Sequence, residues 1–204
     1  MIKKPSNWDA VEVMEFDHTP IELGGHKGII MKAEEYTSDF SGKKSLKVYV
    51  DTAKDDKQPE YFKKQYENDT RIDRKYPNGA IKYVPIGEEE NQVKMLKSFI
   101  TAYENSNNCQ FDWNKDWEQL TGKKIGIVFG MEEYENQASE LKTVNKLREF
   151  RSIDKIDNIK IPKVKKLDGT YVDYEEYINS KNSSNEPFSD FGNIVEISEE
   201  QLPF

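Results

Sequence analysis

The amino-acid sequence predicts a mainly β fold: a five-stranded barrel with a helix between strands 3 and 4, a long inserted loop and a disordered acidic C-terminal tail. Residues 44–52 alternate apolar and polar side chains, the period of two that a half-buried strand requires. Residues 91–105 repeat apolar side chains at intervals of three and four, as one face of a helix does. From residue 179 onward Asn, Ser, Glu and Pro dominate, a composition that cannot bury enough apolar surface to fold.

The first two strands are expected to pair through a turn at 38–42. In the first, about 26–36, one face is predicted to carry Ile29, Met31 and Ala33, and the other Ile30, Lys32, Glu34 and Tyr36. In the second, 44–52, the predicted inward residues are Leu46, Val48 and Val50, and the outward ones are Ser45, Lys47, Tyr49 and Asp51.

The remaining elements follow in order. A polar insertion at 53–80 is expected to contain a short helix at about 59–68, and the Pro77-Asn78-Gly79 turn then leads to a third strand at about 80–86. The helix at 91–105 carries an apolar stripe of Val93, Leu96, Phe99, Ile100 and Tyr103. A fourth strand at about 124–131 is apolar on both faces, a fifth at about 142–155 is long and basic, and an Asp-Gly turn predicts a hairpin at about 163–174.

Three strands, a helix and two further strands is the element order of an OB-fold barrel. We therefore expect one OB-fold domain at 24–178. An N-terminal arm at 1–23, anchored by Trp8, Val11, Val13 and Phe16, would precede it, and the flexible tail at 179–204 would follow it.

Composition excludes several classes of protein. Cys109 is the only cysteine, so no intrachain disulfide can form and a reducing compartment is expected. Neither a signal peptide nor an apolar stretch of about 20 residues is found, which predicts a cytoplasmic protein without a membrane partner. His18 and His26 lack partners at motif spacing, and no phosphate-binding loop occurs, so neither an enzyme nor a cofactor is predicted.

The charge is unevenly distributed along a chain whose net charge is −8. Between Lys142 and Lys166 nine basic residues face three acidic ones, whereas from Lys181 to Phe204 one basic residue faces five acidic ones. Aromatic residues make up 12%, more than a small core needs. A basic segment and surface rings together favour a nucleic-acid partner, while the acidic end favours a different one.

Three surfaces combine cations with rings, the pairing that holds single-stranded nucleic acid, because cations bind phosphates and any base can stack on a ring. The second strand and its flanks contribute Lys32, Tyr36, Phe40, Lys43, Lys44, Lys47 and Tyr49. The insertion contributes Tyr61, Tyr66, Arg71, Arg74 and Tyr76, and the fifth strand contributes Lys146, Arg148, Phe150 and Arg151. Each surface has a plainer interpretation: a solvated strand face, a surface helix held by its own rings, or, for Phe150, a core side chain.

The last eight residues, Ile197-Ser-Glu-Glu-Gln-Leu-Pro-Phe204, resemble the C-terminal tip of bacterial and phage single-stranded DNA-binding proteins. In that family the tip docks in pockets on replication and repair proteins. The resemblance implies a partner-binding role for Glu199, Glu200, Leu202, Pro203 and Phe204. The ring of Phe204 and the free carboxylate suit an apolar pocket with a basic rim.

Internal segments extend this resemblance over about residues 24–165. They are Ser41-Gly-Lys-Lys-Ser-Leu, Lys97-Ser-Phe-Ile-Thr-Ala-Tyr-Glu-Asn-Ser-Asn, Leu120-Thr-Gly-Lys-Lys and Phe150-Arg-Ser-Ile-Asp-Lys-Ile. They are similar to a family of early proteins of Gram-positive phages that are thought to bind single-stranded DNA. The insertion at 53–80 is longer than in compact cellular members, so neither the DNA path nor the oligomeric state follows from the resemblance.

These observations predict binding and protection of single-stranded DNA during phage replication or recombination in an infected or lysogenic bacterial host. The tail would recruit replication and recombination proteins. The alternative is an OB-like protein-interaction adaptor, or a nucleic-acid mimic, that binds no DNA. An enzyme such as a nuclease is a third interpretation, which ranks behind the other two and would require metal-dependent cleavage of nucleic acid. The sequence leaves open whether the chain acts as a monomer or a homo-oligomer.

Overall fold

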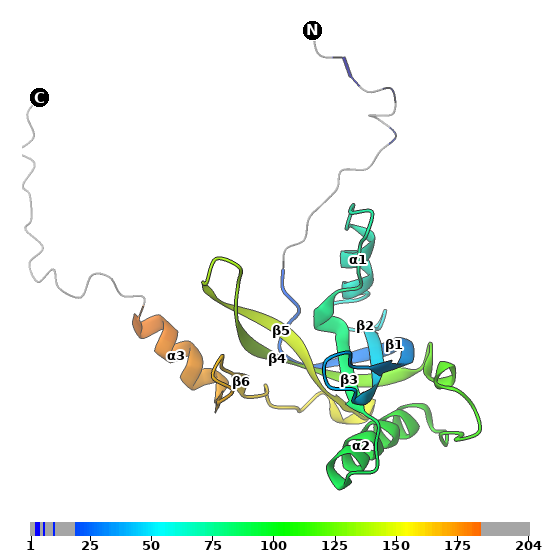
Figure 1. Cartoon of the computed structure of the whole chain (residues 1–204). Coiled ribbons are helices and arrows are strands. Elements are labelled where there is room, and N and C mark those ends of the chain that lie inside the picture. The colour runs from blue at the N-terminus through cyan, green and yellow to red at the C-terminus, as the bar shows by residue number, and fades with distance from the viewer. Residues whose placement is uncertain (1–2, 5, 7–9, 11–18, 185–204) are drawn as a thin grey trace, which may run out of the picture.

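The computed structural model describes residues 3–4, 6, 10 and 19–184 (Figure 1). Within them the elements are β1 (Gly24–Thr37), β2 (Lys44–Thr52), α1 (Tyr61–Glu67), β3 (Ile81–Pro85), α2 (Glu90–Asn107), β4 (Lys124–Glu135), β5 (Leu141–Arg151), β6 (Val164–Lys165), β7 (Tyr171–Val172) and α3 (Tyr174–Ser184). The prediction of a mainly β fold with a helix between the third and fourth strands is confirmed.

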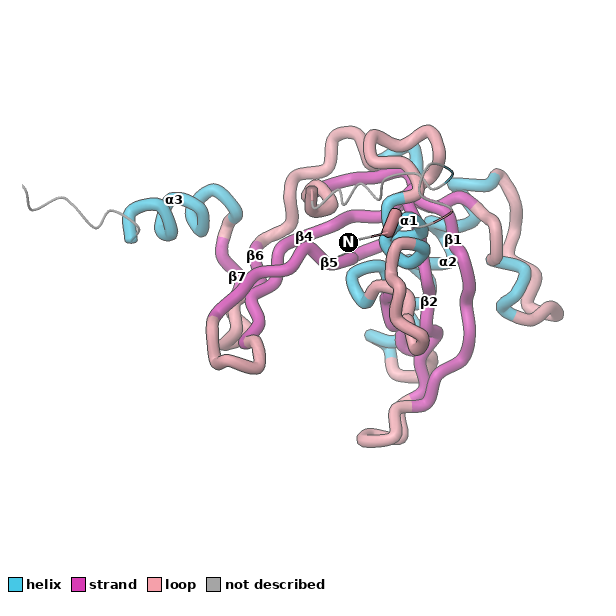
Figure 2. The backbone as a smooth tube through the Cα atoms, turned by 90° about the horizontal axis from the view of Figure 1, so that it is seen from above, coloured by secondary structure: helices cyan, strands magenta, loops and turns pink. Residues whose placement is uncertain are grey.

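The seven described strands form one mixed sheet in the order β3-β2-β1-β4-β6-β7, and β5 also pairs with β4. β1 is antiparallel to both β2 and β4, whereas β6 joins β4 in parallel through Glu132 and Lys165. β4 and β5 continue beyond the rest of the sheet as a long ribbon toward β6, β7 and α3 (Figure 2). β3 approaches β5 without forming a ladder with it, so hydrogen bonds do not close the sheet into a barrel.

The core lies between the curved sheet and α2. Leu46, Val48 and Val50 of β2 are fully buried, which confirms the predicted inward face of that strand. On β4 every residue from Ile125 to Gly130 is buried, as its two apolar faces predicted. Phe99, Ile100 and Tyr103 of α2 are buried in the core, whereas Val93 of the predicted stripe remains exposed.

The predicted faces of β1 are wrong in its first half, because the pairing register shifts between Ile30 and Lys32. Such a bulge adds one residue to a strand and reverses the side-chain alternation beyond it. Ile30 is therefore 0% exposed and Met31 40% exposed. The prediction had placed Met31 on the same face as Ala33, and Ile30 on the opposite face. After the bulge Ala33 points inward, while Lys32 and Tyr36 are exposed on the outer face as predicted.

The C-terminal part of the described chain packs on the β4–β5 ribbon. β6 and β7 form the predicted hairpin, in which Gly169 has a φ of +85°, a conformation that favours glycine. Helix α3 was not predicted, and it extends to Ser184, beyond the expected start of the tail at 179. Glu133 of β4 is buried and holds both the helix and the hairpin against the ribbon. Its carboxylate accepts hydrogen bonds from the Tyr177 hydroxyl of α3 (2.8 Å) and from the Leu167 amide between β6 and β7 (3.1 Å).

Two further predictions concern other parts of the chain. The arm anchors Trp8, Val11, Val13 and Phe16 and the segment 185–204 lie outside the described residues. Among the residues that are described, no helix has the length and apolar character needed to cross a membrane.

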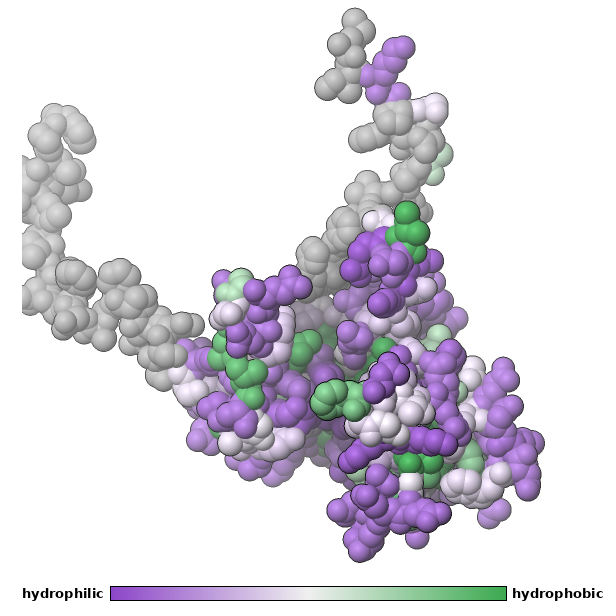
Figure 3. All heavy atoms as spheres, in the orientation of Figure 1, coloured by the Kyte–Doolittle hydropathy of each residue, from purple (hydrophilic) through white to green (hydrophobic). Residues whose placement is uncertain are grey.

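The visible surface in Figure 3 is mainly hydrophilic with small hydrophobic patches.

Candidate nucleic-acid interface

A row of five tyrosines crosses the outer face of β1, β2 and β3 and continues onto the insertion. The ring centroids of Tyr36 and Tyr83 are 5.2 Å apart, those of Tyr49 and Tyr76 6.0 Å, and those of Tyr76 and Tyr66 5.9 Å. We call these five residues the tyrosine row. Tyr36 and Tyr83 at one end are exposed, so their ring faces are accessible to a ligand.

Cations lie against the same rings. The ammonium group of Lys47 is 4.9 Å from the ring centroid of Tyr49, 5.8 Å from that of Tyr83 and 5.9 Å from that of Tyr36. It therefore joins the two halves of the row. Interaction with the Tyr49 hydroxyl raises the pKa of Lys47, which keeps the ammonium group charged. At the far end, the guanidinium group of Arg74 lies 4.7 Å from the ring of Tyr66.

Strand pairing explains why these side chains meet. Lys47 of β2 is paired with Glu34 of β1 on one side and with Tyr83 of β3 on the other. Tyr49 is likewise paired with Lys32. Residues that are opposite each other in adjacent strands share a face and lie within contact distance, so the ladder itself positions the row.

Glu34 is the carboxylate within this face. It accepts a hydrogen bond from the Tyr49 hydroxyl (2.8 Å) and forms an ion pair with Lys32 (2.6 Å). The hydrogen bond from Lys32, followed by that from Tyr49, lowers the pKa of Glu34, so the group stays ionised. Glu34 thus orients Tyr49 and balances Lys32, whereas Lys47 forms no ion pair among the described residues.

The insertion is held in place by Asp51, a β2 residue that was predicted to face solvent but is only 2% exposed. Its carboxylate accepts hydrogen bonds from the backbone amides of Phe62 (2.8 Å) and Lys63 (3.2 Å) in the first turn of α1. Glu60, the residue before the helix, makes no side-chain cap. Asp51 therefore supplies the capping acceptor from a different element. Tyr76 is anchored by a hydrogen bond from its hydroxyl to the Val50 carbonyl oxygen (2.9 Å).

The turn between β1 and β2 lies beyond the end of the tyrosine row. Phe40 is 101% exposed there, and Lys43 and Lys44 are exposed beside it. Neither lysine forms an ion pair with another described residue. The turn therefore combines an exposed ring with adjacent cations, the two kinds of side chain that contact single-stranded nucleic acid.

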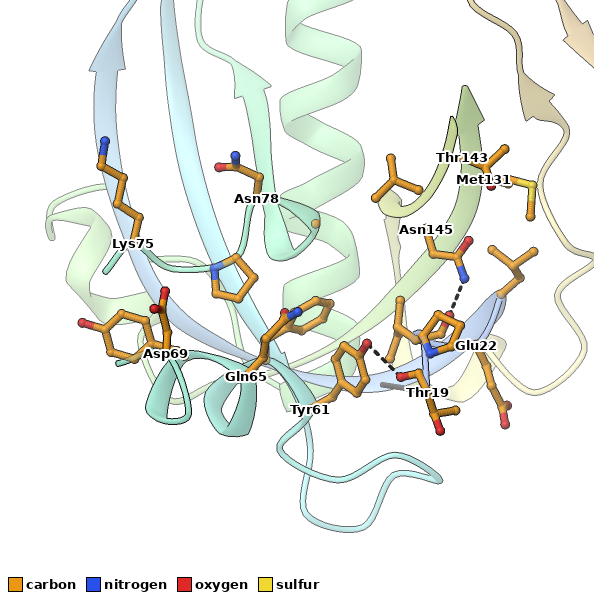
Figure 4. Close-up of a pocket in the computed structure, with 18 of the residues that line it drawn as sticks. Thr19, Glu22, Tyr61, Gln65, Asp69, Lys75, Asn78, Met131, Thr143 and Asn145 are labelled. Atoms are coloured by element: carbon orange, nitrogen blue, oxygen red, sulfur yellow. Dashed lines mark hydrogen bonds between the residues drawn. The ribbon is translucent and has the colours of Figure 1, made fainter. Parts of the chain in front are cut away.

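Two residues predicted in the insertion lie on a different surface. Arg71 forms paired hydrogen bonds with the Asp69 carboxylate, one of them 2.6 Å long, and these lower the pKa of Asp69 to about 2. The Tyr61 hydroxyl donates to the Thr19 carbonyl oxygen at 3.1 Å. Both residues line a cleft of about 1170 Å³ between α1, residues 19–23 and the β4–β5 ribbon (Figure 4). Tyr66 lines this cleft as well, so it borders both surfaces.

The residues predicted on β5 divide into two groups. Phe150 is not available to a ligand, because it is 8% exposed and packs 4.9 Å from Phe99 in the core. Lys146 and Arg148 project from the other face and contact Glu132, at 3.8 Å and 3.2 Å. Arg151 forms an ion pair with Glu149 at 2.8 Å. The strand therefore contributes cations but no aromatic ring.

Sequence reasoning missed Tyr83, the most exposed ring that contacts Lys47. The available signal was the alternation of the third strand, which places Tyr83 on the face opposite to buried Val84. The pairing register with β2 was also needed. Among the described residues, no group of three His, Cys, Asp or Glu side chains could hold a metal ion.

Comparison with protein-family models and with curated protein sequences finds no match to this chain.

Proposed function

We propose that the chain binds single-stranded DNA with little sequence preference, and that the tyrosine row with Lys47 is the central contact. The row is the observation that supports this function best, because it places accessible rings on one continuous face with a cation that forms no ion pair among the described residues. Bases stack on such rings whatever their identity, and the cation binds the phosphates between them. In a duplex the base faces are already stacked, so the row favours single strands.

We also propose that the sheet is an OB-fold with an open seam. The order β3-β2-β1-β4-β5 and the position of α2 between β3 and β4 support this assignment. OB-folds are partly open barrels in which the faces of strands 2 and 3 bind oligonucleotides. The tyrosine row occupies that face.

A second part of the proposal concerns the segment Glu199, Glu200, Leu202, Pro203 and Phe204. Its resemblance to the partner-binding tip of single-stranded DNA-binding proteins supports a role in recruiting replication or recombination proteins during phage growth. Deleting Pro203 and Phe204 should abolish recovery of such partners and leave DNA affinity nearly unchanged, because no charged side chain is lost. Retention of every partner by the two-residue deletion would contradict this role.

The test of DNA binding uses fluorescence anisotropy with labelled oligo-dT and a duplex of equal length. The wild-type chain should bind the single strand well above the duplex. Tyr83→Ala should weaken binding about 5- to 150-fold, which corresponds to roughly 1–3 kcal/mol for one stacked base. Tyr134→Ala is the matched control, because Tyr134 is 43% exposed against 45% for Tyr83 but lies outside the row.

Salt dependence gives an independent measurement. If about four phosphates are neutralised, affinity should fall about 50-fold between about 50 and 200 mM salt, from a slope of about −0.7 per contact. Lys47→Gln should reduce the slope by about one contact. Equal binding of duplex and single strand, or no binding of either, would refute the proposal and favour the protein-interaction adaptor.

A further inference from the structure

Three cations converge on one carboxylate on the outer side of the β4–β5 ribbon. Glu132 of β4 contacts Lys165 at 2.8 Å, Arg148 at 3.2 Å and Lys146 at 3.8 Å. Burial of Glu132 opposes its ionisation, but the hydrogen bond from Lys165 and the charges of Lys146 and Arg148 outweigh it and lower the pKa of Glu132. We call these four residues the Glu132 cluster. Its cations outnumber its carboxylate three to one.

An accessible ring and a hollow adjoin the cluster. Tyr171 of β7 is 55% exposed, and the guanidinium group of Arg148 lies 5.5 Å from its ring centroid. A shallow hollow of about 370 Å³ is lined by Arg148, Glu149, Pro162, Lys163 and Tyr171. A cation and an exposed ring thus lie beside a hollow, and the tyrosine row combines the same two kinds of group.

Lys82 of β3 lies on the face opposite to Tyr83, because it pairs with buried Val48. It precedes Tyr83 in β3, and the seam between β3 and β5 brings it near Lys146 and Arg148. Burial and then the charges of Arg148 and Lys146 lower the pKa of Lys82. Lys82 forms no ion pair with any residue in the described part of the chain. The charges of Glu149 and Glu132 offset only part of this effect, because the pKa of Lys82 remains lowered. An added anion would stabilise a partly buried lysine that lies among other cations, so the seam favours binding of one.

We infer that the Glu132 cluster and Tyr171 form a second contact for the same DNA strand, reached from the tyrosine row across the β3–β5 seam. A backbone phosphate would replace Glu132 as the anion bound by Arg148, Lys146 and Lys165, and Tyr171 would stack on a base. Arg148 suits this role, because a guanidinium group can donate two parallel hydrogen bonds to phosphate. This inference rests on the proposed function and adds that the bound strand extends beyond the OB-fold face.

The inference predicts a dependence on oligonucleotide length. Oligo-dT of about 6 nucleotides fits within one OB-fold site, whereas about 24 nucleotides exceed the usual range of 4–16. Tyr171→Ala should weaken binding of the longer oligonucleotide at least about fivefold and leave binding of the shorter one unchanged. Because Tyr171 is exposed, this variant should fold normally, and an unchanged thermal melt would verify that.

The charged residues provide two opposite tests. Arg148→Gln should weaken only the longer oligonucleotide and reduce its salt slope by about 0.7. Glu132→Gln should strengthen it, because the internal competitor of the phosphate is removed. Lys97→Gln is the control for loss of one positive charge, since Lys97 lies exposed on α2 and is not one of the residues of either site. This control should change binding only slightly, and by the same factor for the short and the long oligonucleotide.

The outcomes separate this inference from the proposed function. Failure of the wild-type chain to bind either oligonucleotide would refute the proposed function. Binding of both, with Tyr171→Ala and Arg148→Gln having the same effect on short and long oligonucleotides, would overturn the second contact and leave the first intact. Weaker binding of the long oligonucleotide by Glu132→Gln would show that the carboxylate does not compete with phosphate, which also overturns the inference.

Discussion

Asp51 is the residue whose removal should most directly uncouple the insertion from the sheet. Asp51→Ala deletes the acceptor for the amides of Thr52, Phe62 and Lys63. The amide of Phe62 is in a buried residue, and a buried donor without a partner costs about 1–3 kcal/mol. Loss of a charge at the start of α1 adds about 0.3–1 kcal/mol. We therefore expect the free energy of unfolding to fall by about 1–4 kcal/mol.

Urea denaturation followed by circular dichroism measures this change. Asp51→Asn should cost less, because its remaining oxygen still accepts from Phe62, although its amide group faces the donor of Lys63. Asp55→Ala is the matched control: the Asp55 side chain is 66% exposed and forms an ion pair with Lys27, so its loss should cost less than about 0.5 kcal/mol. A cost for Asp51→Ala no larger than that for Asp55→Ala would refute the capping role.

Three further predictions concern stability. Phe150→Ala should cost about 3–5 kcal/mol in urea denaturation, since the ring packs against Phe99, and a cost below about 1 kcal/mol would place it outside the core. Burial raises the pKa of Asp56, but the hydrogen bonds from His26 and from the backbone amides of Gln58 and Lys27 together outweigh it and lower that pKa. The stabilisation by Asp56 is therefore complete above the unfolded pKa and is lost as pH falls below about 4. Asp56→Asn should therefore flatten the acid limb of a stability–pH curve, and an unchanged limb would exclude this pair as its cause. Glu133→Ala should accelerate amide exchange in α3 more than in β2, because the Tyr177 hydroxyl loses its acceptor; equal changes in both would contradict a local role.

The sequence predicted best where local pattern and burial agree. Strand β2 begins and ends at the predicted residues, and Leu46, Val48 and Val50 are buried because period two is set by the backbone alone. Helix α2 and the Asp-Gly hairpin follow from equally local signals. The alternation of β2 also placed Lys47 and Tyr49 on the outer face, which is the centre of the tyrosine row.

What could not be predicted depends on contacts distant in sequence. In the sequence, Arg71 and Tyr61 have the same character as Arg74 and Tyr66. In the structure, Arg71 bonds to Asp69 and Tyr61 bonds to the Thr19 carbonyl oxygen, so both lie on the cleft and not in the tyrosine row. The basic residues of β5 looked like one surface, yet the core takes Phe150, and Glu132 binds the cations nearest to it. Composition counts charges and rings, whereas the fold decides which of them are already paired.

The bulge at Met31 shows how one residue couples core and surface. Without it, a strand that buries Ile30 would also turn Lys32, Glu34 and Tyr36 inward, because alternate residues share a face. The ammonium group of Lys32 and the carboxyl group of Glu34 would then enter the core, at a cost of several kcal/mol each. By shifting the register between Ile30 and Lys32, β1 fills the core with Ile30 in its first half. Its second half then supplies Tyr36 and the Glu34 acceptor to the tyrosine row. The outer face therefore depends on a backbone irregularity that side-chain alternation cannot reveal.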